Sequence, residues 1–327
     1  MVANDLITRP AVGGLHHVTA VTGDGQRNVD FYTKTLAMRL VKVTINYDDP
    51  GTYHLYFGDR VGSPGSLITF FVWAGGFGGK RGTGEVGQTA YAVPTSAISF
   101  WKERLAKLGL KVEESVRYGQ TVLAFADPDG LAVELVGSES DAVNPQTQWA
   151  TDDVPAAVAI RGLHSVTLQE VVEELPASVL VDQFGYRRIG QEGNRVRFEI
   201  DAPDNQGRIV DVIVNGVRKF AGGGAGSVHH VAFRTATDEQ QASWLELLRK
   251  EGAHVSPIMD RDYFHSIYFR EPGGVLFEIA TDTPGMLTNE TVETLGTTLS
   301  LPAWLEGARA EIEKGLPAIE RAAVVKA

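Results

Sequence analysis

The chain contains no cysteine among its 327 residues. This absence excludes disulfide bonds, thiolate metal ligands and cysteine nucleophiles, and it is compatible with a reducing cytoplasm. A metal bound by this protein must therefore be held by His, Asp or Glu, and only eight histidines are present. The search for candidate ligands is correspondingly short.

Basic residues are in the minority, and no long apolar run exists. The chain carries 30 Lys and Arg against 41 Asp and Glu, for a formal net charge of −11. This balance argues against nucleic-acid and anionic-membrane partners, since both need clustered Lys and Arg. The longest apolar stretch, 67–73, fits a strand and is too short to span a bilayer. Residues 1–10 lack the apolar centre of a signal peptide, so we expect a cytoplasmic protein.

Motifs for phosphate binding and serine hydrolysis are also missing. The glycine-rich runs at 75–84 and 221–226 have neither a Walker lysine followed by Ser or Thr nor a GxGxxG between strand and helix. We interpret both runs as links between structural modules. No GxSxG nucleophile elbow occurs.

Two histidine pairs stand in matching contexts. His16-His17 lies in GLHHVTAV, His229-His230 lies in SVHHVAFR, and Glu278 ends the run EPGGVLFE. The β-branched residues around them predict strands. Two imidazoles and one carboxylate form the ligand set of a non-heme Fe(II) facial triad. A single His in an apolar strand is more often a core or surface residue, but a repeated pair favours a metal site.

The pairs belong to an internal repeat. Four segments begin with a strand, continue with a helical stretch and end with several strands; the openings are LHHVTAV at 15–21, GQTAYAV at 87–93, LHSVTLQ at 163–169 and VHHVAFR at 228–234. Helical spacing covers 28–36, 97–109 and 239–252, and the last two end in Gly, as a helix C-cap does. The sequence therefore predicts an α+β fold of four tandem βαβββ modules.

Chain length suggests about two domains. The polar, proline-containing segment 138–160 predicts a linker between an N-terminal domain, 1–137, with modules 1 and 2, and a C-terminal domain, 161–282, with modules 3 and 4. Residues 283–327 form a tail with helical spacing in AWLEGARAEIEKGL, which we expect to pack on the body.

Aligning the four openings restricts the metal site. The paired positions read His16-His17, Gln88-Thr89, His164-Ser165 and His229-His230. Only the first and last modules have His in second position, and only the last adds an acid, Glu278. We predict one complete site across modules 1 and 4. The matching acid of module 2, Glu134, is expected to be a solvated or hydrogen-bonded carboxylate that binds no metal.

Strand geometry selects the ligand of each pair. Successive side chains of a strand point to opposite faces, so both histidines of a pair cannot reach one metal. The second one is favoured, because His164 keeps the first position where the second is lost. If 272–274 form a three-residue hairpin loop, Tyr268 faces Glu278 across the ladder. Arg261, in the preceding loop, is placed to reach an anionic substrate oxygen.

The other histidines receive weaker interpretations. His54, flanked by Tyr53 and Tyr56, is interpreted as a packed structural residue rather than part of the site. His164 is interpreted as a structural hydrogen-bonding residue and His254 as a surface loop residue. The sequence does not decide whether His265 lines the substrate site or points to solvent.

These residues resemble the vicinal-oxygen-chelate superfamily, and within it the two-domain ring-cleaving dioxygenases of the hydroquinone 1,2-dioxygenase type. The similarity covers Gly14 to Thr281, including GLHHVTAVTG, DDPGTYHLYFGD and DRDYFHSIYFREPGGVLFEIAT. It implies that Fe(II) is bound by His17, His230 and Glu278, surrounded by His16, Thr19, His229, Arg261 and Tyr268. Where characterised members carry RGYFES, this chain has RDYFHS at 261–266, a difference that bears on substrate identity.

The expected function is that of an Fe(II)-dependent, extradiol-type dioxygenase of aromatic catabolism, which inserts both atoms of O2 into a hydroquinone- or catechol-like diol. His16 or His229 is expected to act as acid or base, and Arg261 and Tyr268 to stabilise oxyanion charge. Mn(II) is the alternative metal. The alternative functions are a glyoxalase-like isomerase or lyase, which usually needs a second carboxylate ligand, and a metal-free protein that binds aromatic compounds. The diol's substituents and the formation of a homo-oligomer stay open.

Overall fold

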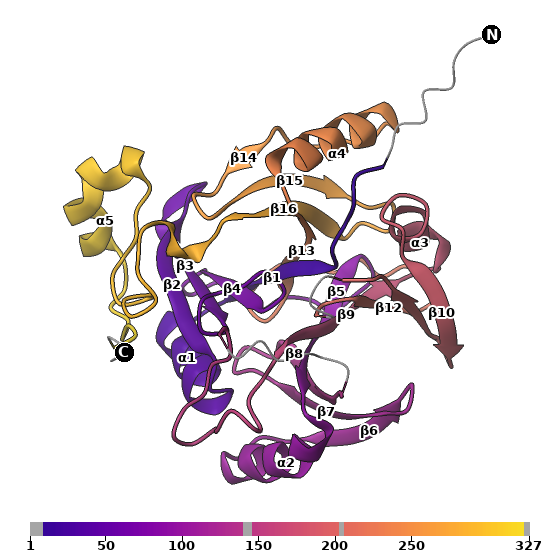
Figure 1. Cartoon of the computed structure of the whole chain (residues 1–327), viewed down its shortest axis with the longest axis horizontal. Helices are drawn as coiled ribbons and strands as arrows, with labels where there is room; N and C mark the ends of the chain where they lie inside the picture. Colours follow the sequence, from indigo (N-terminus) through magenta and orange to yellow (C-terminus); the bar gives the residue numbers. More distant parts are fainter. Residues whose placement is uncertain (1–8, 140–145, 203–205, 324–327) are drawn as a thin grey trace.

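The computed structural model describes residues 9–139, 146–202 and 206–323. Its elements follow the predicted order of strand, helix and three strands in every module (Figure 1). Module 1 contains β1 (Leu15–Thr22), α1 (Gly25–Asp30), β2 (Arg39–Asn46), β3 (Asp49–Gly58) and β4 (Leu67–Val72), with a π-helix at Phe31–Thr35. Module 2 contains β5 (Glu85–Val93), α2 (Ile98–Lys107), β6 (Glu113–Arg117), β7 (Gln120–Ala126) and β8 (Ala132–Gly137), with a 3-10 turn at Thr95–Ala97.

Modules 3 and 4 repeat this plan. Module 3 contains β9 (Gly162–Glu170), α3 (Glu174–Leu180), β10 (Arg187–Glu192), β11 (Arg195–Glu199) and β12 (Ile209–Val214). Module 4 contains β13 (Val228–Thr235), α4 (Asp238–Lys250), β14 (Met259–Asp260), β15 (Phe264–Arg270) and β16 (Leu276–Pro284). The predicted α+β class and the four βαβββ modules are confirmed.

The strands form two sheets of eight, and each sheet joins one module from either half of the chain. The first sheet has the order β14-β15-β16-β13-β1-β4-β3-β2, which combines modules 4 and 1. The second has the order β10-β11-β12-β9-β5-β8-β7-β6, which combines modules 3 and 2. Each sheet therefore contains strands from both sides of the predicted linker at 138–160. That division stays a prediction; residues 140–145 lie outside the described part, and 146–160 contain no helix or strand.

The two histidine pairs meet at the centre of the first sheet. β1 and β13 pair antiparallel, with His17 opposite Ala232 and Thr19 opposite His230. β16 runs parallel to β13 and places Glu278 beside Ala232. Three adjacent strands, β16, β13 and β1, therefore carry the three predicted ligands.

Helix α4 shows how the helices are fixed to the outside of the sheets. The Thr237 side chain caps its first turn by accepting from the Gln240 amide, and Gly252 ends it with φ 85°. The buried Gln241 amide group donates to the backbone oxygens of His265 and Ile279. These bonds tie α4 to β15 and β16, the two strands that carry one side of the site.

The C-terminal tail packs beside β2, as predicted (Figure 1). It contains 3-10 turns at Met286–Thr288 and Ala303–Ala308 and helix α5 at Arg309–Gly315. Leu299 forms a parallel bridge with Val43, and the buried Lys42 ammonium group lies 2.5 Å from the Glu290 carboxylate. Residues 324–327 lie outside the described part of the chain.

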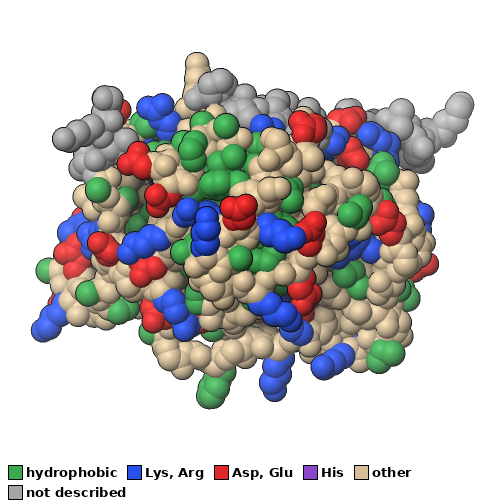
Figure 2. All heavy atoms as spheres, turned by 90° about the horizontal axis from the view of Figure 1, so that it is seen from below, with side chains coloured by type: hydrophobic (Ala, Val, Ile, Leu, Met, Phe, Trp, Pro, Cys, Tyr) green, Lys and Arg blue, Asp and Glu red, His purple; other side chains and the backbone are tan. Residues whose placement is uncertain are grey.

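Charges of both signs are interspersed over the face seen in Figure 2 rather than gathered by sign. Apolar side chains lie between them in small groups. Within the described residues, no helix is both long and apolar enough to cross a membrane.

Two buried carboxyl groups join the sheets away from the metal site. Glu170 ends β9 of the second sheet, and Glu271 lies in the β15–β16 hairpin of the first. Both oxygens of Glu271 accept hydrogen bonds from the backbone of Gly273 and Val275. Burial and the neighbouring Glu271 charge raise the pKa of Glu170 to about 8.

This pKa makes stability depend on pH. An acid whose pKa rises on folding binds its proton more tightly in the folded state, so stability falls as pH rises from about 4.5 toward 8. We expect Glu170→Gln to raise Tm at pH 8.5 by about 2–5 °C, the response of a large domain to roughly 1 kcal/mol, and by less at pH 5. Thermal unfolding with the exposed Glu174→Gln as control measures this. Equal shifts at both pH values would contradict it.

Candidate metal centre

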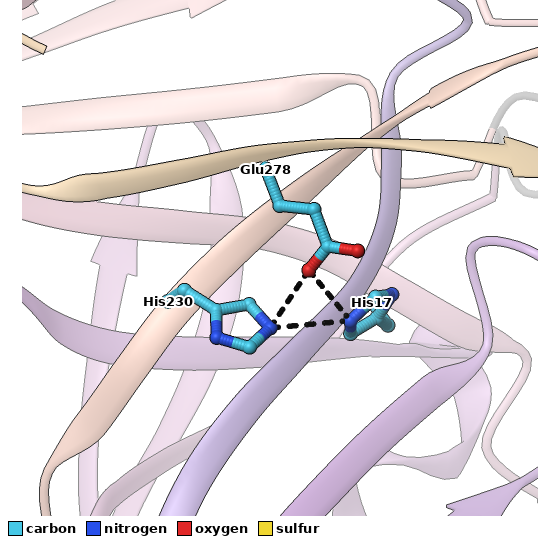
Figure 3. A group of neighbouring side chains, drawn as sticks. All are labelled: His17, His230 and Glu278. Atoms are coloured by element: carbon cyan, nitrogen blue, oxygen red, sulfur yellow. Dashed lines mark hydrogen bonds and ion pairs between the residues drawn. The ribbon is translucent and has the colours of Figure 1, made fainter. Parts of the chain in front are cut away.

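His17, His230 and Glu278 converge on one point of the first sheet (Figure 3). The Nε2 atoms of the two histidines lie 3.4 Å apart. Oε2 of Glu278 lies 3.3 Å from His17 Nε2 and 2.8 Å from His230 Nε2. All three side chains are buried, with at most 4% of their surface exposed.

The hydrogen bonds of the imidazoles fit a cation at this point. His17 Nδ1 lies 2.9 Å from His16 Nδ1, and His230 Nδ1 lies 2.8 Å from His229 Nδ1. If His17 donates the proton of this contact, His16 accepts it through Nδ1. The Nε2 atom of His17 then carries a lone pair.

The carboxylate completes this donor set. Ser266 Oγ donates to Glu278 Oε1 at 2.5 Å, whereas Oε2 faces the Nε2 atoms of His17 and His230. Burial opposes ionisation of Glu278, but His17 and His230 hold its pKa well below the ordinary range. The ionised Glu278 thus faces two imidazole nitrogens, and a divalent cation held among the three groups would balance its buried charge. The three residues therefore fit a divalent metal with imidazole and carboxylate ligands.

A narrow cleft with a free volume of about 30 Å³ opens beside the triad. Aromatic and polar side chains line it: His17, Asn46, Tyr47, His54, Tyr56, Phe71, His230, Arg261, Phe264 and Tyr268. Tyr268 lies directly opposite Glu278 in the β15–β16 ladder, as the predicted three-residue loop requires. These side chains are of the kind that contact an aromatic ligand, and such a ligand would have to move them apart to bring one polar atom to the triad.

Arg261 and Tyr268 lie together on one wall of the cleft. The Arg261 guanidinium carbon lies 5.5 Å from the centre of the Tyr268 ring, and its Nη2 lies 3.0 Å from the Asp48 carboxylate. Burial, together with the Glu278 charge, raises the pKa of Tyr268, so its phenol stays protonated and can donate. Tyr47 and Asp262 meet at 2.6 Å near the same rim.

His16 and His229 occupy different environments. His16 is buried, is absent from the cleft wall and packs on Phe264 at 5.1 Å between ring centres. His229 is exposed and lines a second hollow of about 190 Å³ together with His230, Trp73 and Arg270. Partial desolvation of the ring and the neighbouring His230 lower the pKa of His229 to about 4, so the ring is neutral at pH 7. Of this pair, only His229 has a solvent-accessible ring.

Thr19 lies behind the cleft wall. Its hydroxyl is 2.8 Å from Thr69 Oγ1, which is in turn 2.7 Å from His54 Nε2. His54 also bonds the Tyr56 hydroxyl through Nδ1 at 3.0 Å. The interpretation of His54 as merely structural is thus corrected: it is packed and fully hydrogen-bonded, and it lines the cleft beside the triad.

The second sheet contains the degenerate counterpart of the site. Glu134 is buried and lies 2.7 Å from Arg117, so of the two expected states, solvated or hydrogen-bonded, it has the second, as part of an ion pair. Arg195 donates to Gln88, Thr167 and Asp211. These guanidinium groups supply the positive charge where the first sheet has room for a metal.

The alignment of module 2 also needs a correction by one residue. Ala90 lies opposite Glu134 as Ala232 lies opposite Glu278, which makes Gln88, not Thr89, the equivalent of His230. A register shift directly precedes His17 in β1 and Gln88 in β5, which agrees with the corrected alignment. With either alignment, module 2 has no histidine at the position equivalent to His230.

The remaining histidines lie away from the triad. His164 Nδ1 bonds Ser165 Oγ at 3.0 Å, which confirms a structural hydrogen-bonding role. His254 is an exposed loop residue, as predicted. His265 points to the outer face and bonds Asp238 at the start of α4 at 2.6 Å.

Sequence reasoning did not identify Ser266 and Thr69. Both lie on strands whose period would have placed them on the concave face: Ser266 two positions before Tyr268, and Thr69 in the strand beside β1. Alternation from Tyr268 was the available signal for Ser266. For Thr69, no residue of the same strand had a predicted place in the site from which alternation could be counted.

Two known proteins are similar in sequence to this chain over nearly its whole length. The chain is 44% identical over 303 residues to "Putative ring-cleaving dioxygenase MhqO" of Bacillus subtilis (strain 168), covering 93% of this chain and 95% of that protein. It is 37% identical over 310 residues to chlorohydroquinone/hydroquinone 1,2-dioxygenase of Sphingobium indicum, covering 92% and 95%.

Two solved structures have a similar fold. The crystal structure described as a "putative dioxygenase" from Bacillus subtilis superimposes with a TM-score of 0.91 at 42% identity, covering 95% of this chain and 98% of that one. Glyoxalase I from Zea mays shares the fold, with a TM-score of 0.60 at 16% identity over 83% of this chain and 92% of that one. The family profile matches residues 14–135 and 172–279. The chain belongs to the Glyoxalase/Bleomycin resistance protein/Dioxygenase superfamily.

Proposed function

We propose that this protein is an Fe(II)-dependent, extradiol-type ring-cleaving dioxygenase that adds both atoms of O2 to a hydroquinone- or catechol-like diol. The observation that carries the proposal is the buried set of two imidazoles and one carboxylate at the floor of an aromatic-lined cleft. Relatives that match over nearly the whole chain are named for ring cleavage, and one of them for hydroquinone. We propose the cytoplasm as the compartment.

His17, His230 and Glu278 would hold the metal, and Mn(II) is the alternative to Fe(II). When bound, the iron supplies the one-electron chemistry that links an aromatic diol to O2. The backing residues matter as much as the ligands, because His16, His229 and Ser266 fix the orientation of the three donor groups.

The cleft residues would orient the diol and manage its protons. Tyr268 and Arg261 present donor groups on one wall, where they can stabilise negative charge on a phenolic oxygen. If His230 uses Nε2 for the metal, its Nδ1–H donates to His229 Nδ1 and leaves the His229 proton on Nε2. The neutral His229 ring can then donate a hydrogen bond to a substrate oxygen, and it acts as a proton donor only after it takes up a second proton.

The register of the first sheet disfavours the isomerase alternative. Thr19 and Ala232 each lie two residues after the proposed ligand histidine of their module. Thr69 stands opposite Thr19, and Glu278 stands opposite Ala232, so Thr69 occupies the position in module 1 that Glu278 has in module 4. A second carboxylate ligand from module 1 would have to come from this position. Thr69 cannot supply it.

Oxygen uptake tests the proposal. Protein loaded anaerobically with Fe(II) should consume O2 in equal amount with hydroquinone or catechol and form a ring-opened product. We expect Tyr268→Phe to lower kcat/KM by about 10- to 100-fold, the effect of one hydrogen bond to a charged group. Absence of O2 uptake with every diol, together with isomerisation of a thiol adduct, would overturn the dioxygenase and support the isomerase.

A further inference from the structure

The cleft of the first sheet has two related halves. Tyr56 lies opposite Thr69 in the β3–β4 ladder, as Tyr268 lies opposite Glu278 in the β15–β16 ladder. The two tyrosines therefore occupy matching positions on either side of the triad. The strand order places β3 beyond β4 from β1, so Tyr56 and Tyr268 approach from opposite flanks of the cleft.

The match extends to the residues behind the tyrosines. Ser266 bonds Glu278 on one side, and His54, in the equivalent position, bonds Thr69 on the other. The short Thr69 side chain leaves this flank of the triad without a protein ligand. A substrate can thus lie between the triad and the wall formed by His54 and Tyr56.

That wall contains a hydrogen-bond chain with one favoured direction. Thr69 Oγ1 is the one partner that the described residues give the Thr19 hydroxyl, which is fully buried. If Thr69 donated to Thr19, the Thr19 proton would have no acceptor among the described residues, and buried donors are seldom left unpaired. Thr19 therefore donates to Thr69.

The donor direction of this first hydrogen bond determines the direction of the next two, which lead to the cleft. Burial lowers the pKa of His54 well below its usual value, so its ring is neutral and carries one proton. With Thr69 donating to His54 Nε2 at 2.7 Å, that proton lies on Nδ1 and is donated to the Tyr56 oxygen at 3.0 Å. The Tyr56 proton is left to point into the cleft.

We propose that Tyr56 is a specificity residue that donates a hydrogen bond to the substrate oxygen remote from the metal, and that Thr19, Thr69 and His54 are positioning residues that orient its proton. The inference rests on the proposed function, because it takes the substrate to be an aromatic diol bound at the triad. It favours a diol whose second oxygen reaches the far wall, as in a hydroquinone. Burial and the neighbouring tyrosines raise the pKa of Tyr56, which keeps this donor protonated.

Binding to Zn(II)-loaded protein tests the proposal without turnover. Hydroquinone, 4-methoxyphenol and phenol are titrated calorimetrically against wild type, Tyr56→Phe and Thr69→Val. Tyr56→Phe should weaken hydroquinone and 4-methoxyphenol about 5- to 20-fold, since both carry an acceptor oxygen, and should change phenol less than about twofold. Thr69→Val should weaken the same two ligands, Thr69→Ser should restore them, and the double variant should add little to Tyr56→Phe.

Tyr53→Phe is the matched control, because Tyr53 lies on the same strand and packs in the hydrophobic core. Equal losses for all three ligands in Tyr56→Phe would overturn the proposal, as would unchanged 4-methoxyphenol binding or a Thr69→Val protein that binds like wild type. If Thr69→Val loses zinc, Thr19→Val replaces it with the same expectations. Since no O2 is consumed, this binding pattern can hold even if ring cleavage is not observed, and the two proposals fail separately.

Discussion

Replacing Glu278 with Gln is expected to abolish metal binding at stoichiometric concentrations and to leave activity at background. The amide keeps the size of the side chain but removes the only negative charge of the triad, and Ser266 still has an oxygen to bond. Losing one of three ligands leaves two neutral imidazoles, a weak site for Fe(II). Metal content after gel filtration should fall from about one ion per chain to near zero.

Glu134→Gln is the matched control for this experiment. Glu134 occupies the same place in the closing strand of module 2, is also buried and pairs with Arg117. Its variant should keep the metal and the activity, with at most a loss of stability from the broken ion pair. A Glu278→Gln protein that retains full metal, or a Glu134→Gln protein that loses it, would refute the assignment of a single site. Circular dichroism of both variants checks that the fold persists.

The location of the triad was predictable because two independent patterns meet there. Strand alternation separated His17 from His16, and the repeat excluded modules 2 and 3, which lack a second imidazole. The hairpin loop before Glu278 then fixed Tyr268 opposite it, and the ladder has that register. These inferences needed only local geometry.

Other features depend on long-range pairing that periodicity does not encode. The repeat predicts four similar modules, but not that each sheet joins modules from opposite halves of the chain. His54 looked structural because its neighbours along the chain are tyrosines, yet β3 turns it toward the triad from across β4. The arginines that fill the second cup, among them Arg117 and Arg195, lie in strands without a recognisable motif.

The difference between His16 and His229 also comes from tertiary packing. Each directly precedes a histidine of the proposed metal site, so the sequence does not distinguish them, and in the structure each contacts that histidine through Nδ1. In the fold, Phe264 and the strands around it bury His16, whereas His229 borders a hollow and contacts Phe71 edge-on at 5.4 Å. Only His229 can exchange a proton with a bound molecule or with solvent.

We therefore expect His229→Ala to separate turnover from metal binding. With metal at saturating concentration, its metal content should stay near wild type, while kcat falls about 10²-fold, as expected for a lost general acid. His16→Ala should act only through His17, lowering metal affinity by about 10- to 100-fold and recovering most of its kcat when metal is added. His230→Ala should lose the metal altogether. Equilibrium metal titration and steady-state kinetics on the same samples distinguish these effects. If His229→Ala loses the metal while His230→Ala keeps it, then the first histidine of each pair is the ligand, and the register proposed for the whole site is wrong.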